Sequence, residues 1–215
     1  SFVKKGFFCP FLYIVFSYTS FMSKNEILNY LKNAKIQDPM LEKICYYFSL
    51  DYTASTTAKE LNLSRQTINN YYKIIRTLLL KKQEELILDM KSSSANNGFS
   101  LKYLQSNSDL NYFIEYDEKV FIIDSDFSFL PKINNLLNED IKSSLHNNSK
   151  SNCAKVLFNQ RNQRYLVMRM LKTSNNMQEF VDKRLKKFRG LNKENLLVHL
   201  KESQFRFNYS NEYLH

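Results

Sequence analysis

Apolar positions recur with helical spacing through the first part of the chain. Between residues 22 and 50 two amphipathic segments follow this pattern, and the second has the capping residue Asp38 before Pro39 at its first helical position. Two more helices are predicted at residues 54–61 and from residue 64 to about Met90. The first part of the chain is therefore predicted to be all-helical.

The spacing of apolar positions changes from helical to alternating after a polar stretch. KSSSANNGFS, residues 91–100, is rich in Ser and Asn, lacks apolar periodicity and predicts a linker. Beyond it, alternating positions predict one hairpin around Asp117–Glu118 and a second around residues 159–162. A helix is predicted between the hairpins, and two more follow at the C-terminal end with Gly190 between them as a C-cap.

These patterns predict an α+β protein with four segments. The segments are an upstream or non-native apolar stretch at 1–21, a helical domain at 22–90, the linker at 91–100, and a small α+β domain with β-hairpins and two C-terminal helices at 101–215. The apolar run in the first segment contains Pro10 and is shorter than the roughly 20 residues that span a bilayer. We therefore expect no membrane partner, and a cryptic membrane anchor is the alternative interpretation of this segment.

The net charge of the chain indicates what kind of partner the protein binds. The 215 residues carry a formal net charge of +10, and residues 151–215 alone carry 13 basic against 5 acidic side chains. An excess of this size favours a polyanionic partner. The three cysteines are widely scattered, which predicts neither a disulfide framework nor a metal site and favours a reducing, cytoplasmic compartment.

Residues 54–73, ASTTAKELNLSRQTINNYYK, have the pattern of a helix-turn-helix. Ala58 is small enough for a second helix to cross close to the first, and Asn62 tolerates the left-handed geometry of a tight turn. Ser64 can cap the second helix. Apolar residues that would join the two helices follow at matching positions: Leu61, Leu63, Ile68 and Tyr71.

The remaining side chains of the second helix are suited to reading DNA. Arg can pair with guanine and Gln or Asn with adenine, while Thr, Lys and further Arg side chains can contact phosphates. The predicted DNA-binding residues here are Ser64, Arg65, Gln66, Thr67, Asn69, Asn70, Lys73 and Arg76. An ordinary helical hairpin with a polar face is the alternative interpretation of this pattern.

Two separated stretches resemble a known family. DYTASTTAKELNLSRQTINNYYKIIR, residues 51–76, resembles the N-terminal helix-turn-helix of bacterial insertion-sequence transposases that carry an RNase-H-like DDE catalytic domain. RLKKFRGLNKENLLVHLKESQFRFN, residues 184–208, resembles the closing segment of that group, in which a basic helix ending K-F-x-G precedes a helix with the pattern H-L-K-E-x-x-x-R-F-N. The resemblance implies a bacterial, cytoplasmic protein that binds the double-stranded DNA ends of an insertion sequence.

The resemblance also implies catalytic acids. Asp117 is the best match to the first catalytic Asp of the family, and Glu179 lies one helical turn after Asn175, which occupies the position of the last catalytic Glu. Asp117 and Glu179 are thus the implied catalytic pair, with Mg²⁺ as the metal of an active enzyme and no cofactor otherwise certain. Only about 60 residues separate them, fewer than the family uses, and Asp124 or Asp126 would be the second acid.

A basic run on the penultimate predicted helix is a further candidate for DNA contact. Its predicted phosphate-binding residues are Lys183, Arg184, Lys186 and Lys187. The alternative is a solvated helix whose Lys stems cover apolar neighbours.

Three hypotheses follow. The first, which we favour, is a transposase-like protein that recognises DNA through the helix-turn-helix and whose catalysis is degenerate. The second is an active metal-dependent DDE transposase. The third is a helix-turn-helix transcriptional regulator whose C-terminal domain serves dimerisation or ligand sensing, and a homo-oligomer is compatible with all three.

Overall fold

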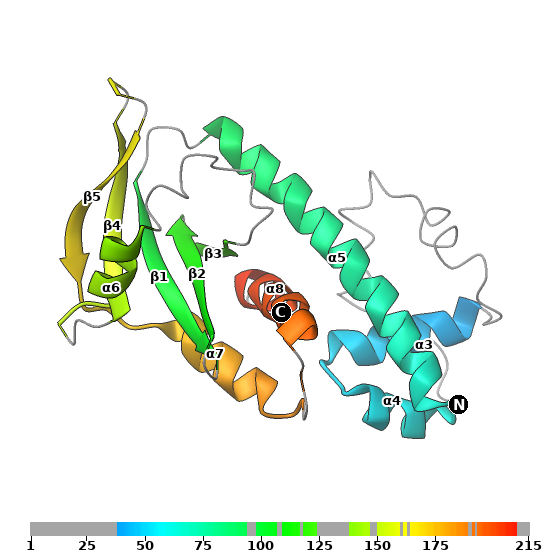
Figure 1. Ribbon diagram of the computed structural model, residues 1–215. Helices are drawn as coiled ribbons and strands as arrows, with labels where there is room; N and C mark the ends of the chain where they lie inside the picture. The colour runs from blue at the N-terminus through cyan, green and yellow to red at the C-terminus, as the bar shows by residue number, and fades with distance from the viewer. Residues whose placement is uncertain are drawn as a thin grey trace, which may run out of the picture. The chain divides into compact units, whose positions relative to one another are not determined.

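A computed structural model describes most of the chain from Asp38 onward. The described residues are 38–93, 98–106, 109–116, 118–123, 138–146, 150–159, 161–162, 164–188, 191 and 193–209. They form a mixed α+β structure with six helices and one five-stranded antiparallel sheet (Figure 1). The predicted α+β class is therefore confirmed. Expectations for residues 1–21, the helix predicted at 22–35, and Asp117, Asp124 and Asp126 lie outside the described residues.

The chain divides into two compact units. Of the described residues, the first unit contains 38–81 and the second contains those from 82 to 209. The division falls inside a long helix, α5 (Arg65–Ser93), so one continuous helix contributes to both units. Regular structure resumes at Phe99, and the interval between elements is accordingly shorter than the predicted linker.

The first unit is built from α3 (Asp38–Ser49), α4 (Ala54–Leu61) and the first part of α5. Its core forms where the apolar faces of these helices meet. Ile44 and Phe48 of α3 and Ile68 and Tyr72 of α5 are all buried. The rings of Phe48 and Tyr72 meet edge to face with centroids 4.9 Å apart, a favoured geometry for aromatic pairs.

The second unit contains the sheet, whose strand order is β3-β2-β1-β4-β5. Its strands are β1 (Phe99–Ser106), β2 (Asp109–Tyr116), β3 (Lys119–Ile122), β4 (Cys153–Asn159) and β5 (Arg164–Leu171). The predicted hairpins are confirmed as β2–β3 and β4–β5, and each neighbouring pair is antiparallel. In the first of these turns Glu118 has a φ of 62°, a left-handed conformation common in tight hairpins.

Each face of the sheet packs against helices. Because successive strand residues point to opposite faces, Leu101 joins a cluster with Leu145 of α6 (Glu139–His146), whereas Leu104 joins a cluster on the other face. That second cluster includes Met177 of α7 (Asn176–Leu185) and Leu200 of α8 (Lys193–Tyr209). The two predicted C-terminal helices are confirmed and cover this face.

Side chains of α8 cover the edge of the sheet at β3. The backbone N–H and C=O of Val120 bond to the amide of Asn208 at 2.8 and 2.9 Å, and the N–H of Ile122 donates to Gln204 at 2.7 Å. These bonds satisfy backbone groups that an edge strand otherwise exposes. The β3 edge is therefore closed to pairing with another strand.

Strand β1 was not predicted from the sequence. It is the central strand, and its polar residues Ser100 and Lys102 are buried along with its apolar ones. The Lys102 ammonium contacts the Glu115 carboxylate at 2.7 Å and donates to the Ser174 carbonyl at 3.1 Å. Just before the strand, a Cβ on Gly98 would lie 2.6 Å from the Val156 carbonyl oxygen, so this close approach requires glycine.

Candidate nucleic-acid interface

A short turn joins α4 to α5 and is fixed by local hydrogen bonds. Thr53 caps α4 by accepting from the Thr56 N–H at 3.2 Å. The helix ends at Asn62, which has a φ of 53° and a ψ of 44°, the left-handed conformation that Asn tolerates. Ser64 then caps α5 by accepting from the Thr67 N–H at 3.0 Å. The left-handed conformation of Asn62 and the cap at Ser64 were both predicted from the sequence.

The inner face of this helix pair is buried. Ala58 of α4 is buried, and Ile68 of α5 is fully buried. A buried hydrogen bond of 2.6 Å joins the hydroxyls of Thr57 and Tyr72, one from each helix. Burial raises the pKa of the Tyr71 phenol above its usual value.

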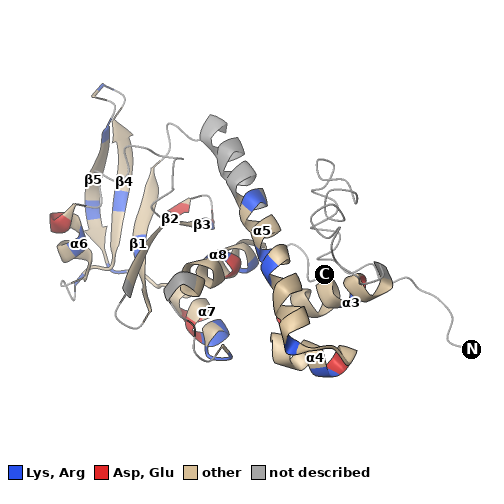
Figure 2. Cartoon of the chain, turned by 45° about the vertical axis from the view of Figure 1, so that its right-hand side comes forward, with Lys and Arg blue, Asp and Glu red and all other residues tan. Residues whose placement is uncertain are grey.

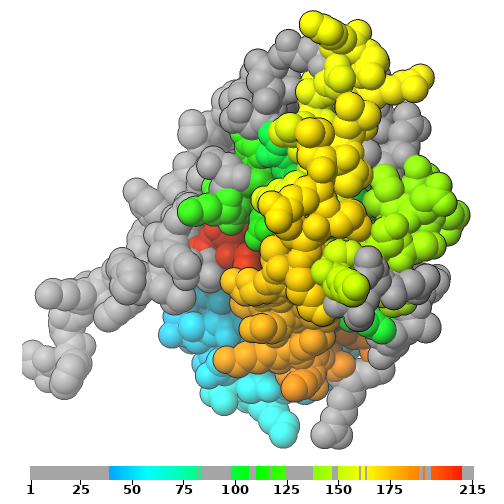
Figure 3. Space-filling model, turned by 90° about the vertical axis from the view of Figure 1, so that its left-hand side faces the viewer, coloured from blue at the N-terminus to red at the C-terminus, as the bar shows by residue number. Residues whose placement is uncertain are grey.

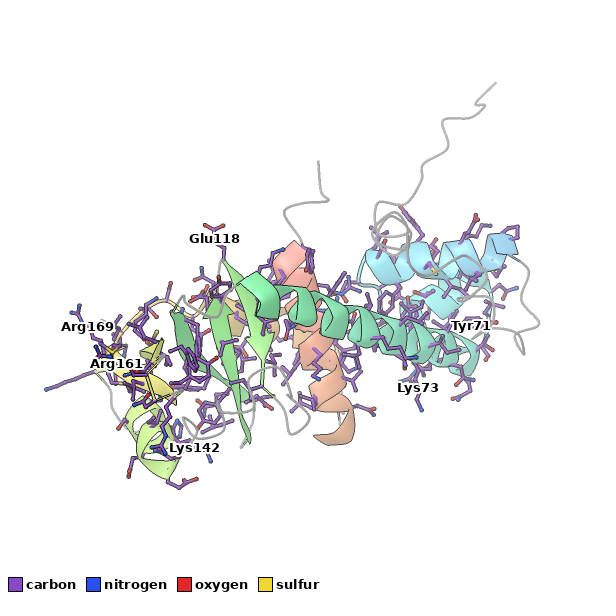
Figure 4. The ribbon with its side chains drawn as sticks, turned by 90° about the horizontal axis from the view of Figure 1, so that it is seen from above. Tyr71, Lys73, Glu118, Lys142, Arg161 and Arg169 are labelled. Atoms are coloured by element: carbon purple, nitrogen blue, oxygen red, sulfur yellow. The ribbon has the colours of Figure 1, made fainter. Side chains whose placement is uncertain are left out.

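The outer face of α5 presents polar and basic side chains to solvent. These exposed residues are Arg65, Gln66, Asn69, Asn70 and Lys73. They occupy the first turns of α5, and Lys73 extends outward from the helix (Figure 4). The Gln66 amide donates to the Asn70 side chain at 3.3 Å, one turn further along. All five side chains were predicted from the sequence.

Three other predicted contact residues have structural partners. The Thr67 hydroxyl lies 2.8 Å from the Ser64 hydroxyl, so both serve the cap of α5. The guanidinium of Arg76 lies 5.5 Å from the ring centroid of Phe48 and 5.7 Å from that of Tyr72, within cation–π range. These residues position the exposed face of α5.

The basic run at the C-terminal end of α7 and just beyond it is only partly exposed. Lys183, Lys186 and Lys187 are exposed, but Arg184 retains only 5% of its accessible surface. Its guanidinium contacts the Glu202 carboxylate at 2.5 Å and donates to the Ser203 hydroxyl at 2.8 Å. A guanidinium buried in this way cannot reach a phosphate, so the structure removes Arg184 from the predicted interface.

Glu202 is the centre of a buried ionic cluster between α7 and α8. Its side chain is 2% exposed and also contacts the Arg206 guanidinium at 2.9 Å. Leu200 of the same helix lies in the core, and Asn208 closes the β3 edge. Residues of the closing pattern H-L-K-E-x-x-x-R-F-N thus form the contacts that pack α8 against α7 and the sheet.

Of the implied catalytic residues, only Glu179 lies within the described part of the chain. Asp117 lies outside it, and Glu179 is exposed in the first turn of α7. Asn175 caps this helix by accepting from the Gln178 N–H at 3.2 Å, and its amide donates to the Tyr103 carbonyl at 2.8 Å. Because an ionised Glu accepts but does not donate hydrogen bonds, it could not replace both contacts.

Across the described residues, no cluster of three or more His, Cys, Asp or Glu side chains is arranged to hold a metal ion. None of the helices within these residues combines the length and apolar character that crossing a bilayer requires.

Sequence reasoning missed a second basic surface, on β4 and β5. Its exposed cations are Lys155, Arg161, Arg164 and Arg169. The signal that could have revealed it is the absence of any Asp or Glu between residues 141 and 178. The alternation of apolar and polar residues predicted that these strands form a hairpin, but it did not show that their exposed face is basic.

Comparisons of the chain with family models, with curated proteins and with solved structures find no match. The geometry of the chain itself therefore carries the functional argument.

Proposed function

We propose that this protein is a DNA-binding, transposase-like protein of an insertion sequence that recognises duplex DNA through a helix-turn-helix formed by α4 and α5. One observation carries the proposal. The left-handed turn at Asn62 joins two helices that a buried hydrogen bond between Thr57 and Tyr72 links, and Arg65 and Gln66 are exposed at the start of α5. A recognition helix reads base edges with its N-terminal residues.

The chemistry of the exposed face supports base reading. Arg65 offers two parallel donors to the O6 and N7 of guanine, and the amides of Gln66, Asn69 and Asn70 fit adenine. Lys73 lies further along α5, where side chains meet phosphates and set the register of the protein on the duplex. In the second unit, the exposed Lys183, Lys186 and Lys187 are proposed phosphate contacts.

Replacing Arg65 and Gln66 together with Ala is expected to abolish sequence preference while leaving weak, salt-sensitive binding. Each lost bidentate contact removes about 1–3 kcal/mol of discrimination. The measurement is fluorescence-anisotropy titration with duplexes from the terminal repeats of the flanking DNA and with scrambled duplexes. Arg65→Lys retains the positive charge but loses the two parallel N–H donors of the guanidinium. It should therefore lower sequence preference more than non-specific affinity for DNA.

Lys43→Ala, on the exposed side of α3, is the control that removes one cation outside the proposed interface. It should leave sequence preference unchanged. If the Arg65 and Gln66 double variant discriminates between the two duplexes as well as the unaltered protein does, α5 is not the reading helix.

The protein is expected to bind these DNA ends without cutting them. Asn175 holds the position of the implied catalytic Glu and uses its amide to cap α7 and bridge to β1, which leaves no carboxylate there to bind Mg²⁺. The measurement is strand cleavage and joining of labelled terminal-repeat DNA with Mg²⁺ or Mn²⁺. Metal-dependent cleavage that Asp117→Ala abolishes would instead establish the active-transposase alternative.

A further inference from the structure

Strands β4 and β5 form an antiparallel ribbon at one end of the sheet, here called the basic ribbon. One side of this ribbon belongs to the core, where Ala154 and Val156 are buried and Val167 packs beside them. A register shift between Lys155 and Val156 leaves Met168 without a direct partner and marks a β-bulge. The opposite side of the ribbon is exposed.

Three cross-strand pairs make up the exposed side of the basic ribbon. Directly opposite residues share a face, and the pairs are Asn159 with Arg164, Leu157 with Leu166, and Lys155 with Arg169. Leu157 and Leu166 are 45% and 40% exposed. Along the strands, the apolar pair of Leu157 and Leu166 therefore has a pair with at least one cationic side chain before it and another after it.

This surface has an unbalanced positive charge. The segment that forms the ribbon, residues 153–171, has no Asp or Glu but four cations: Lys155, Arg161, Arg164 and Arg169. Figure 2 shows Lys and Arg on both strands and no acidic residue on either. Among the described side chains, no carboxylate lies within ion-pair distance of Arg161, Arg164 or Arg169. Unneutralised guanidinium groups of this kind attract anions.

The basic ribbon is also accessible. Within the described residues β5 pairs with β4 alone, and Figure 3 shows this part of the chain facing the viewer with no other coloured segment over it. Arg161 and Arg169 lie at the outer end of the sheet (Figure 4). Pairing β5 with a second copy of itself would bring the cations of both copies together, which disfavours that occupant.

We propose that the basic ribbon is a second DNA-binding surface, which contacts the phosphates of duplex DNA independently of base sequence. A two-stranded ribbon fits the major groove, which is about 12 Å wide. On β4 the pair that contains Arg164 and the pair that contains Arg169 are four residues apart, from Asn159 to Lys155. At about 3.3 Å per residue, the two pairs lie roughly 13 Å apart. The two ends of the ribbon can therefore reach phosphates on both sides of the groove, with Leu157 and Leu166 between them.

The test compares two charge-matched variants of the full chain, and it rests on the proposed DNA binding. Arg164→Gln with Arg169→Gln removes two cations from the basic ribbon. Lys43→Gln with Lys142→Gln removes two from elsewhere, since Lys43 lies on α3 and Lys142 on α6, against the other face of the sheet. Binding of a random-sequence 30-base-pair duplex, a length of about 100 Å at 3.4 Å per pair, is measured across a salt series.

The ribbon variant is expected to bind about tenfold more weakly near 0.1 M salt, and its slope of log K against log salt should be shallower by about 1.8. The control variant should match the unaltered protein. Arg164→Lys with Arg169→Lys retains the charge and should restore most of the affinity, which separates phosphate contact from misfolding.

Equal binding by the ribbon variant and the control would overturn the inference while leaving the proposed function intact. No binding of any duplex by the unaltered protein, including the terminal repeats, would overturn the proposed function and this inference with it. A dimer that Leu166→Lys dissociates, with the salt slope unchanged by the ribbon variant, would assign the surface to a second copy and also overturn the inference.

Discussion

Glu202→Gln is expected to destabilise the second unit by about 3–5 kcal/mol, the loss typical of breaking a buried ion pair from one side. The carboxylate is 2% exposed and contacts the guanidinium groups of both Arg184 and Arg206. Glutamine keeps nearly the same shape but removes the negative charge, so two largely buried cations lose their counter-ion. Because the contact with Arg184 joins α7 to α8, the effect should be concentrated in those helices.

The measurement is native-state hydrogen exchange of the amides of α7 and α8, with urea unfolding as the global readout. Glu139→Gln is the matched control, because its pair with Lys142 on α6 is exposed, with 85% of the Glu139 side-chain surface accessible. An exposed pair of this kind contributes about 0–1 kcal/mol. Equal losses of unfolding free energy in the two variants would mean that the Glu202 cluster is accessible to water and does not hold the helices together.

Ile68→Ala is expected to destabilise the first unit by about 2–5 kcal/mol, through lost apolar transfer free energy and the cavity that remains. Ile68 is fully buried and lies on the inner face of α5, where its neighbours are also buried. DNA binding should fall with the folded fraction, and lower temperature should restore part of it. The measurement is thermal unfolding followed by circular dichroism, together with duplex binding at two temperatures.

Asn69→Ala, one residue away on the exposed face of the same helix, separates folding from recognition. Its stability should change by less than about 0.5 kcal/mol, whereas preference for the terminal-repeat duplex should fall at every temperature. Were Asn69→Ala to unfold the unit, or Ile68→Ala to leave its stability unchanged, the assignment of inner and outer faces of α5 would be wrong.

Much of the local structure follows from short sequence signals. The left-handed Asn62, the Ser64 cap, the two hairpins and the C-terminal helices were all predicted, because each depends on residues within a few positions of one another. Strand β1 was missed although Phe99, Leu101 and Tyr103 alternate with polar residues, and this alternation could not show that Ser100 and Lys102 are buried. Their burial depends on partners at Lys155, Glu115 and Ser174, which are distant in sequence.

The candidate site divides in the same way. Arg65, Gln66, Asn69, Asn70 and Lys73 are exposed as the helical period predicts, because a period determines which side of a helix a residue occupies. The period could not show that Arg184 is buried, since its carboxylate partner lies 18 positions later on another helix. The pairing of Arg169 with Lys155 on one exposed face likewise depends on the register of β4 against β5.

The sequence by itself determined the described helices, four of the five strands, the turn at Asn62 and the cap at Ser64, the exposed polar face of α5, and the excess of positive charge toward the C-terminal end. These are properties of neighbouring residues and of composition, which the backbone expresses locally. The tertiary structure alone decided which charges are buried, which edge of the sheet is closed, and which cations share a surface. Each of those outcomes requires contacts between segments far apart in the chain, and a local pattern carries no information about them.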